Sequence, residues 1–238
     1  MTDPRRTICL IPARGSSKRI PRKNIKPFLG KPIIAWPIET ALSTDLFDQV
    51  IVSTDDSEIA DIATAYGASV PFMRPDKMAD DHATITDVIS DTLDTIACAG
   101  HHYDYMFMVY ATAPNVKVAD IQSGFTLLKD KNYDTVFSIV KFSFPIQRAL
   151  HLDDAGTIEY IEPQHAYTRS QDLPERYHDA GQWIWIDIKK FMANGRHLIA
   201  GNSGAIALNP MFFHDIDDET DWQIAEQKMK LQEAVNNI

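Results

Sequence analysis

A cluster of basic side chains follows the first apolar run of the chain. The run Ile8 to Ile11 predicts a buried β-strand, and the stretch as far as Asn24 reads as a long loop. Five of ten consecutive residues in this loop are cationic, namely Arg14, Lys18, Arg19, Arg22 and Lys23. The chain as a whole has a formal net charge of −10, so this cluster is a local anion site, and a triphosphate fits it best.

The basic loop matches neither of the common glycine-rich phosphate motifs. Its sequence, I-P-A-R-G-S-S-K-R-I-P-R-K-N, contains neither G-x-x-x-x-G-K-[ST] nor G-x-G-x-x-G. A solvated basic loop is the alternative interpretation. Open α/β sheets bind their ligands beyond the carboxyl ends of the strands, and the loop lies there, which favours the anion site.

A second group of chemically useful residues lies near the end of the chain, at Asp215-Ile216-Asp217. If this segment is extended, Asp215 and Asp217 share one face and Ile216 points to the core, because side chains alternate along a strand. Proteins hold Mg²⁺ through one or two carboxylates together with substrate phosphates, so the pair predicts a magnesium site. Capping or solvation is the alternative for this pair, and it is the favoured interpretation for the acids from Asp218 to Asp221.

Other polar residues follow other predicted strands. Asp55-Asp56 could contact a ribose or a metal, although a helix N-cap is the favoured interpretation. Arg74 follows the third predicted strand and is a candidate nucleotide contact, with a surface ion pair as the alternative. Tyr110 leaves the fourth strand at the same edge, and His178 could donate to a substrate carboxylate or simply face solvent.

Composition limits the class of protein. With 238 residues, 45% hydrophobic and 24% charged, the chain can form one large or two small globular domains. The longest apolar runs fall short of the roughly 20 residues of a membrane helix, so we expect no membrane partner and a cytoplasmic location. A pI near 5.2 argues against nucleic acid as a partner. Cys9 and Cys98 lack C-x-x-C spacing and are expected to be reduced core thiols.

The first part of the chain alternates strand and helix patterns. Strands are predicted at 7–12, 49–53, 68–72, 105–110 and 135–140, with helices at 33–43, 57–66, 84–98 and 119–129. Such alternation predicts an α/β fold with a doubly wound, mainly parallel sheet. It breaks between 141 and 176, where two strand-like pieces, 147–152 and 157–161, flank a turn. Strands at 182–186 and 205–208 and a helix at 219–235 follow.

These patterns predict two units. Residues 1–140 and 177–238 form an α/β domain that binds a nucleotide, and residues 141–176 form an inserted segment. The insert carries apolar side chains that a single domain has little reason to display, including Phe142, Phe144, Ile146 and Leu150. We therefore expect a homodimer in contact through the insert.

The motifs occur together in an order that resembles a known family. They are A-R-x-x-S-K-x-x-P-x-K-N, L-G-K-P-I, V-I-V-S-T-D, F-x-R-P and D-I-D-x-E-x-D-W, and they cover nearly the whole length. With them, the chain resembles the cytidylyltransferases that activate nonulosonic acids, the CMP-sialic acid synthetase family. The motifs Y-A-T-A-P, F-P-I-Q-R-A-L, T-R-S-Q-D-L and Y-H-D-A-G-Q are similar to the pseudaminic acid cytidylyltransferase branch.

The chain also departs from the family pattern. Sialic acid enzymes usually carry Gln at the place of Tyr110 and Arg at the place of His178, so their sugar contacts do not transfer to this chain. The segment Q-W-I-W from Gln182 to Trp185 differs from the Q-F-Y-W of the pseudaminic acid branch. Legionaminic acid and N-acetylneuraminic acid therefore stay open as alternative sugars.

The resemblance implies a fold of the nucleotide-diphospho-sugar transferase type and a Mg²⁺-dependent reaction. In that reaction CTP and a nine-carbon 2-keto sugar acid give the CMP-sugar and pyrophosphate. The residues that the resemblance assigns to CTP are Arg14, Ser17, Lys18, Lys23, Asn24 and Arg74, with Arg14, Lys23 and Asp217 as catalytic residues and Asp215 and Asp217 as metal ligands. The residues expected at the sugar are Tyr110, Arg148, Arg169, Gln171, His178 and Gln182, some of them acting across the dimer.

Two other classes remain as alternatives. A metal-dependent glycosyltransferase would also carry a D-x-D motif, but it would not need the basic loop after the first strand. A non-catalytic nucleotide sensor on the same fold is disfavoured, because the loop cations and the paired carboxylates are both present.

Overall fold

The computed structural model, which describes residues 6–80 and 82–236, is built around a six-stranded sheet. In spatial order the strands are β10 (Ser203–Ala207), β6 (Thr135–Lys141), β9 (Tyr177–Asp187), β5 (Tyr105–Val109), β1 (Thr7–Pro12) and β4 (Gln49–Ser53). Five of them run parallel, and β9 runs antiparallel to its neighbours β5 and β6. The predicted mainly parallel sheet is confirmed, and the reversed β9 is an addition to it.

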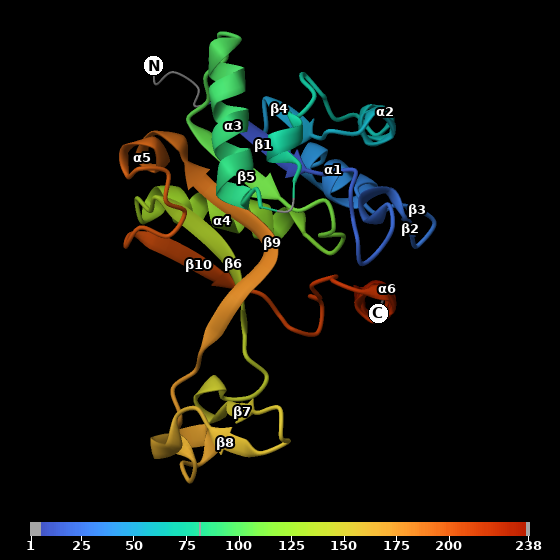
Figure 1. Ribbon diagram of the computed structural model, residues 1–238. Coiled ribbons are helices and arrows are strands. Elements are labelled where there is room, and N and C mark those ends of the chain that lie inside the picture. The colour runs from blue at the N-terminus through green and yellow to red at the C-terminus, as the bar shows by residue number, and fades with distance from the viewer. Residues whose placement is uncertain (1–5, 81, 237–238) are drawn as a thin grey trace.

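Helices cover both faces of the sheet (Figure 1), as predicted for a doubly wound fold. On one face, α1 (Ala35–Leu42), α2 (Ser57–Ala65) and α4 (Val118–Asp130) pack against side chains such as Phe107 and Trp185. On the other face lie α3 (Ile85–Cys98) and the short α5 (Ile188–Ala193). Because both faces are covered, the inner strands are apolar almost throughout, and all five residues of β5 are buried.

Local sequence signals explain where these helices begin. Thr84 accepts a hydrogen bond from the backbone N–H of Asp87, whose side chain accepts from Thr84 in return, so a capping box starts α3. Pro37 is the third residue of α1. A helix tolerates proline there because the first N–H groups have no partner within the helix.

Three sequence predictions are wrong. Segment 68–72 forms no strand, and its isolated bridge joins Ser69 to Ile51. This is consistent with Pro71, which lacks an N–H to donate. Residues 146–148 form a 3₁₀ turn instead of the start of a strand. Cys98 is exposed at the end of α3, whereas Cys9 is buried in β1 as expected.

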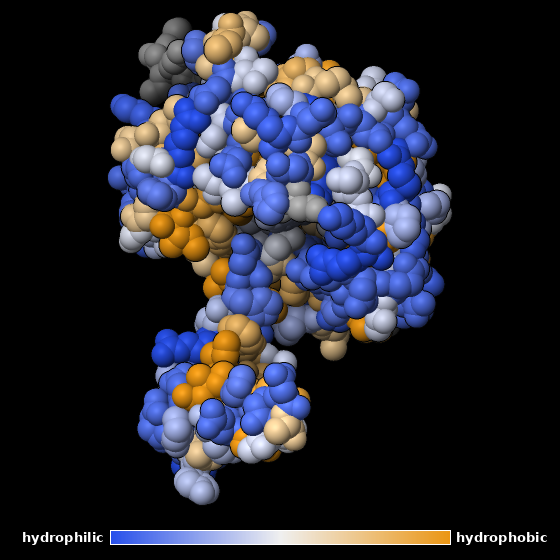
Figure 2. Space-filling view, in the orientation of Figure 1, coloured by the Kyte–Doolittle hydropathy of each residue, from blue (hydrophilic) through white to orange (hydrophobic). Residues whose placement is uncertain are grey.

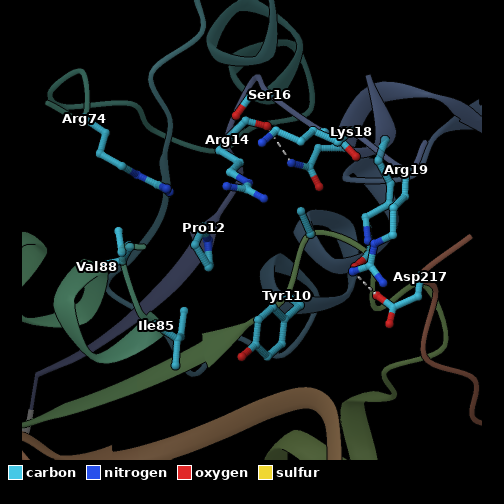
Figure 3. Close-up of a pocket in the computed structure, with 16 residues that line it drawn as sticks. Pro12, Arg14, Ser16, Lys18, Arg19, Arg74, Ile85, Val88, Tyr110 and Asp217 are labelled. Carbon is cyan, nitrogen blue, oxygen red and sulfur yellow. Dashed lines mark hydrogen bonds and ion pairs between the residues drawn. The ribbon is translucent and has the colours of Figure 1, made fainter. Parts of the chain in front are cut away.

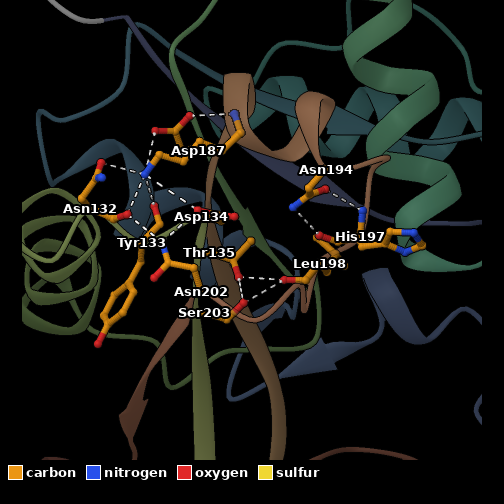
Figure 4. A network of polar contacts seen from close by, with 11 residues as sticks. Asn132, Tyr133, Asp134, Thr135, Asp187, Asn194, His197, Leu198, Asn202 and Ser203 are labelled. Atoms are coloured by element: carbon orange, nitrogen blue, oxygen red, sulfur yellow. Dashed lines mark hydrogen bonds and ion pairs between the residues drawn. The ribbon is translucent and has the colours of Figure 1, made fainter.

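The short helix α5 was missed by sequence reasoning, and a polar network fixes it to the start of β6 (Figure 4). Asp187 ends β9 and caps α5 by accepting a hydrogen bond from the backbone N–H of Lys190. The Lys190 ammonium donates to the backbone carbonyls of Asn132 and Tyr133, at 2.6 and 3.0 Å. This network closes the end of the sheet opposite the carboxyl ends of its parallel strands.

A third apolar cluster joins the loop after β1 to the end of the chain. Its buried members are Ile20, Phe28, Ile33, Ile216, Trp222, Ala225 and Met229. Phe28 belongs to a hairpin of two very short strands, β2 (Pro27–Phe28) and β3 (Lys31–Pro32), and Trp222 lies on the closing helix α6 (Glu219–Asn236). The rings of Phe28 and Trp222 meet edge to face at 5.4 Å.

The segment between β6 and β9 projects away from the sheet (Figure 1). It contains the antiparallel hairpin of β7 (Leu150–Leu152) and β8 (Ile158–Tyr160), whose turn includes the predicted Asp153 and Gly156. Its surface carries apolar side chains (Figure 2), and the exposed ones are Phe144, Ile146, Leu150, Leu152, Ile158, Ile161 and Tyr167. Across the described part of the chain, no helix is both long and apolar enough to cross a membrane.

Candidate active site

The predicted site segments meet at one edge of the sheet. The carboxyl ends of β1, β4, β5 and β10 lie there, together with the amino end of the reversed β9. A cavity of about 590 Å³ opens at this edge (Figure 3). Its lining residues are Pro12, Arg14, Ser16, Ser17, Lys18, Arg19, Lys23, Asn24, Arg74, Ala83, Ile85, Val88, Tyr110, Ala111, Thr112 and Asp217.

The start of the basic loop is fixed by the two acids that follow β4. The backbone N–H of Gly15 donates to Asp55 Oδ1 at 2.9 Å. A Cβ atom on Gly15 would lie only 2.7 Å from an oxygen of Asp56, so the close packing requires glycine. Asp56 also caps α2 by accepting from the N–H of Ile59, which agrees with the N-cap interpretation of this pair.

Arg22 differs from the other cations of the loop. Its guanidinium binds Asp56 through two hydrogen bonds of 2.5 and 3.0 Å, and it also contacts Glu58 at 2.6 Å. This pairing raises the pKa of Arg22 and lowers the pKa of Asp56 to about 2. The backbone of Arg22 is left-handed, with φ of 55°, which turns this side chain toward α2. Four of the five loop cations therefore line the cavity, and Arg22 holds the loop in place.

Lys23 and Asn24 connect the loop to other parts of the site. The Lys23 ammonium donates to the backbone carbonyl of Ile216 at 2.6 Å, and burial lowers the pKa of Lys23. The Asn24 amide donates to the carbonyl of Arg14 at 2.8 Å and so holds the backbone at that residue. The Arg14 guanidinium donates to the backbone carbonyl of Asp80 at 3.2 Å.

Arg74 is buried at the cavity wall, with only 6% of its surface exposed. Its guanidinium donates to the hydroxyl of Ser53 at 3.1 Å and to the backbone carbonyl of the same residue. Burial lowers the pKa of Arg74. The structure thus shows a buried side chain anchored to the end of β4, and not the alternative of a surface ion pair.

Ile216, between the two carboxylates near the end of the chain, is fully buried as the alternation predicts, and of the two carboxylates only Asp217 lines the cavity. Burial, and next the neighbouring carboxylate of Asp217, raise the pKa of Asp215. Asp217 lines the cavity and forms an ion pair with Arg19, with 2.7 Å between Nη2 and Oδ1. Within residues 6–80 and 82–236, no three His, Cys, Asp or Glu side chains form a group able to hold a metal.

The donor set nevertheless fits a hard cation that substrate phosphates would help to hold. Two neighbouring carboxylates are the number that Mg²⁺ usually takes from a protein. Gly181, with φ of 61°, leaves space in front of Asp215, since a Cβ there would lie 3.5 Å from Oδ2 and 3.6 Å from Oδ1. Asp215 and Asp217 are therefore the candidate ligands for the expected Mg²⁺.

Tyr110 was one of the residues expected at the sugar. Among the described residues of a single chain, it is the only one of that set that lines this cavity. Burial, and next the carboxylates of Asp179 and Asp215, raise the pKa of Tyr110 to about 12. The phenol therefore keeps its proton and can donate a hydrogen bond to a ligand at neutral pH. Asp179, which sequence reasoning did not single out as a site residue, accepts from the N–H of Gly181 at 2.8 Å in a turn-like start of β9.

The other predicted sugar contacts lie elsewhere in the single chain. His178 is exposed, and its ring lies 4.7 Å from that of Phe142. Gln182 is buried and lines a separate cavity of about 120 Å³ beside Asn115. The other three, Arg148, Arg169 and Gln171, belong to the projecting segment and do not line the cavity of about 590 Å³.

Several lining residues were missed by sequence reasoning. Ile85 and Val88 lie in the predicted helix 84–98, for which no site role was expected, and the first turn of that helix, α3, also faces the cavity. Ser16 and Thr112 supply hydroxyl groups on two other loops. Thr112 follows the buried strand β5, and this position was the one signal in the sequence that could have indicated a site residue there.

Comparison with known proteins agrees with this geometry. A family model described as cytidylyltransferase matches residues 8–198. A pseudaminic acid cytidylyltransferase of Campylobacter jejuni is 36% identical over 93% of this chain and 95% of its own length. A CMP-N,N'-diacetyllegionaminic acid synthase of Legionella pneumophila is 29% identical over 97% of this chain and 99% of its own length.

A solved structure supports the fold. That of CMP:2-keto-3-deoxy-manno-octonic acid synthetase complexed with CTP aligns with a TM-score of 0.68 over 95% of this chain and 99% of the other, at 15% identity. The expected nucleotide-diphospho-sugar transferase type of fold is thus confirmed. The chain belongs to the cytidylyltransferase family, among the CMP-nonulosonic acid synthetases, and is a CTP-dependent nucleotidyltransferase.

Proposed function

We propose that this enzyme joins CTP and pseudaminic acid to give CMP-pseudaminic acid and pyrophosphate, with Mg²⁺ as cofactor. The observation that carries the proposal is one cavity that brings the basic loop and Asp217 together at the carboxyl ends of the parallel strands. This arrangement matches the charges of a metal-bound nucleoside triphosphate, because the cations face phosphate and the carboxylate faces the metal.

The proposed reaction needs no nucleophile from the protein. The anomeric hydroxyl oxygen of the sugar attacks the α-phosphorus in line, and the bond from the α-phosphorus to the oxygen that bridges it to the β-phosphorus breaks. Pyrophosphate leaves with that bridging oxygen, and the hydroxyl proton passes to water. Arg14 and Lys23 would hold the triphosphate through charge-assisted hydrogen bonds, and Ser17 and Lys18 would complete the phosphate cradle from the same loop. The protein thus contributes mainly positioning and charge neutralisation.

Nucleoside binding would use the residues around Arg74 and Asn24. Arg74 is fixed by Ser53, and Asn24 is fixed by the backbone of Arg14, so both would reach the ligand from prepared positions. The apolar side chains of Ile85 and Val88 line the same cavity and offer a surface for the base. Mg²⁺, held by Asp215 and Asp217 when bound, would polarise the α-phosphate and lower the pKa of the attacking hydroxyl.

The choice of sugar rests on the residues that differ from the sialic acid pattern. Tyr110 offers a hydroxyl donor in the cavity wall where the sialic acid enzymes usually carry Gln. The similarity to the pseudaminic acid enzyme of Campylobacter jejuni supports the same substrate here. Legionaminic acid and N-acetylneuraminic acid are the alternatives within this function.

We also propose that the enzyme is a homodimer that pairs through the projecting segment. The segment stands apart from the sheet and leaves apolar side chains such as Leu152 and Ile158 more than 60% exposed. Exposure of this extent is typical of a surface that a partner covers. Pairing through it could carry Arg148, Arg169 and Gln171, which lie outside the cavity of their own chain, to the sugar site of the partner.

The test is a pyrophosphate-release assay with CTP against a panel of nonulosonic acids. We expect release that depends on both CTP and Mg²⁺ and is fastest with pseudaminic acid. Faster release with legionaminic or N-acetylneuraminic acid would replace the proposed sugar. Transfer from a nucleotide-sugar without pyrophosphate release would indicate the glycosyltransferase alternative, and CTP binding with no turnover on any sugar would indicate the sensor.

A further inference from the structure

A guanidinium of the basic loop binds a carboxylate of the proposed metal site inside the cavity at the carboxyl edge of the sheet. Arg19 Nη2 lies 2.7 Å from Asp217 Oδ1, and both side chains line the cavity (Figure 3). Both also remain open to solvent, with 65% of the Arg19 side chain and 50% of the Asp217 side chain exposed. A ligand that enters the cavity can therefore reach both members of the pair.

The two members of this pair suit different parts of one ligand. A guanidinium binds phosphate oxygens, and a carboxylate binds a divalent cation. A cation at Asp217 would also repel the adjacent guanidinium, so the ion pair and the metal compete for the same oxygen atoms. Arg19 was not among the residues assigned to CTP from the sequence, although it lines the same cavity.

The other contacts of the site leave this exchange free to occur. Lys23 binds the backbone carbonyl of Ile216 and not a carboxylate oxygen, so it can stay in place while Asp217 changes partner. Ile216 is fully buried, which fixes the backbone between the two carboxylates. The ion pair between the exposed side chains of Arg19 and Asp217 can therefore open without movement of the buried backbone at Ile216.

We propose that Arg19 is a displaceable counter-ion that neutralises Asp217 in the free protein and transfers to the triphosphate when CTP and the metal bind. This inference rests on the proposed metal site. In the absence of nucleotide, a divalent cation has to displace Arg19 before it gains Asp217. A triphosphate draws Arg19 away, so nucleotide and metal strengthen the binding of each other.

The test compares Arg19→Gln with Lys18→Gln, using Mn²⁺ alone as the metal probe. Each variant removes one positive charge from the same loop, so the comparison controls for the change in net charge. Mn²⁺ binding to the nucleotide-free protein is measured by electron paramagnetic resonance, and CTP binding is measured by calorimetry in EDTA. We expect Arg19→Gln to bind Mn²⁺ about two- to fivefold more tightly than Lys18→Gln, the range expected for an exposed ion pair.

CTP binding without metal should change in the opposite direction, becoming weaker in Arg19→Gln than in the wild type. General damage to the fold would weaken both ligands, so the opposite signs are specific to the exchange. Equal Mn²⁺ affinities in the two variants would overturn the role of Arg19 while leaving the metal site intact. Mn²⁺ binding that Asp217→Asn leaves unchanged would overturn the metal site, and the exchange with it.

Discussion

The ammonium of Lys23 donates to the backbone carbonyl of Ile216 at 2.6 Å, and this bond joins two segments that lie 193 residues apart. It ties the basic loop after β1 to the carboxylate segment that precedes α6. Ile20 and Ile216 belong to one buried apolar cluster, so hydrophobic packing joins the same two segments. The basic loop and the carboxylate segment are therefore held together by one shared contact region.

Removal of either metal carboxylate should reduce turnover far more than it reduces CTP binding. We expect Asp215→Ala and Asp217→Ala to lower kcat by at least about a hundredfold, because lost charge stabilisation in the transition state costs several kcal/mol. Steady-state kinetics in saturating Mg²⁺ measures this effect. Asp61→Ala, an exposed change on α2, is the control. Turnover close to wild type in both site variants would remove the metal assignment.

Loss of the loop cations should weaken CTP binding. Arg14→Ala and Lys23→Ala each delete a proposed charge-assisted contact to the triphosphate, for which we expect at least a roughly tenfold rise in the Kd of CTP. Titration calorimetry with CTP alone gives this value. Arg6→Ala, which removes a cation over the Tyr103 ring outside the cavity, serves as the control. CTP titrations that match the wild type in both variants would contradict the assignment of the loop.

The ion pair between Arg22 and Asp56 should appear in the stability of the protein at acid pH. The pKa of Asp56 falls from 3.8 to about 2 on folding, so its stabilising effect is complete above about pH 4 and is lost as the pH falls toward 2. Asp56→Ala also removes the cap of α2, and we expect it to lower the free energy of unfolding by about 1–2 kcal/mol at pH 7.

Urea unfolding at pH 6 and at pH 2.5 measures both effects. The difference in the free energy of unfolding between the wild type and Asp56→Ala should be smaller at pH 2.5 than at pH 6. Asp61→Ala on the same helix should have nearly the same free energy of unfolding as the wild type at both pH values. A difference that stays constant between the two pH values would show that the Asp56 carboxylate is not preferentially stabilised in the folded state.

Disruption of the projecting hairpin should dissociate the proposed dimer. Leu152→Asp or Ile158→Asp places a charge among the exposed apolar side chains of the segment, and burial of that charge in an interface is costly. Sedimentation velocity at micromolar concentration should shift from dimer to monomer. Ile199→Asp, which changes a side chain 74% exposed outside the segment, should leave the dimer unchanged. A monomeric wild type would refute the interface.

Sugar discrimination should depend on Tyr110 and on His178. Pseudaminic acid shares its carboxylate with N-acetylneuraminic acid but differs in ring stereochemistry and lacks the C9 hydroxyl, so selection has to act on other groups. We expect kcat/KM for pseudaminic acid to be at least about a hundredfold higher, because a mismatched analogue leaves polar groups of the site unpaired.

Tyr110→Gln or His178→Arg should narrow this ratio, and competition kinetics with both sugars measures it. Tyr177→Phe changes a neighbouring exposed hydroxyl that binds Glu175, and it should leave the ratio unchanged. Comparable efficiency with both sugars in the wild type would show that these positions do not determine the choice.

The sequence by itself determined the main elements and most of the charged residues of the candidate site. Apolar periodicity predicted the sheet and its helices because burial on one or both faces repeats with the geometry of each element. The basic loop and the alternation around Ile216 predicted the four cations and the carboxylate of Asp217 that the structure brings to one cavity. These inferences worked because each depends only on side-chain type and on neighbours close in the chain.

Tertiary structure alone decided which partner each side chain meets. Arg22 looks like its neighbours in the sequence, but it binds Asp56, 34 residues away, and leaves Arg19 to face Asp217. The antiparallel direction of β9 and the position of Gln182 in a separate cavity likewise depend on how the chain returns after the projecting segment. Local patterns record burial and charge, whereas these contacts are made by segments far apart in the chain that only folding brings together.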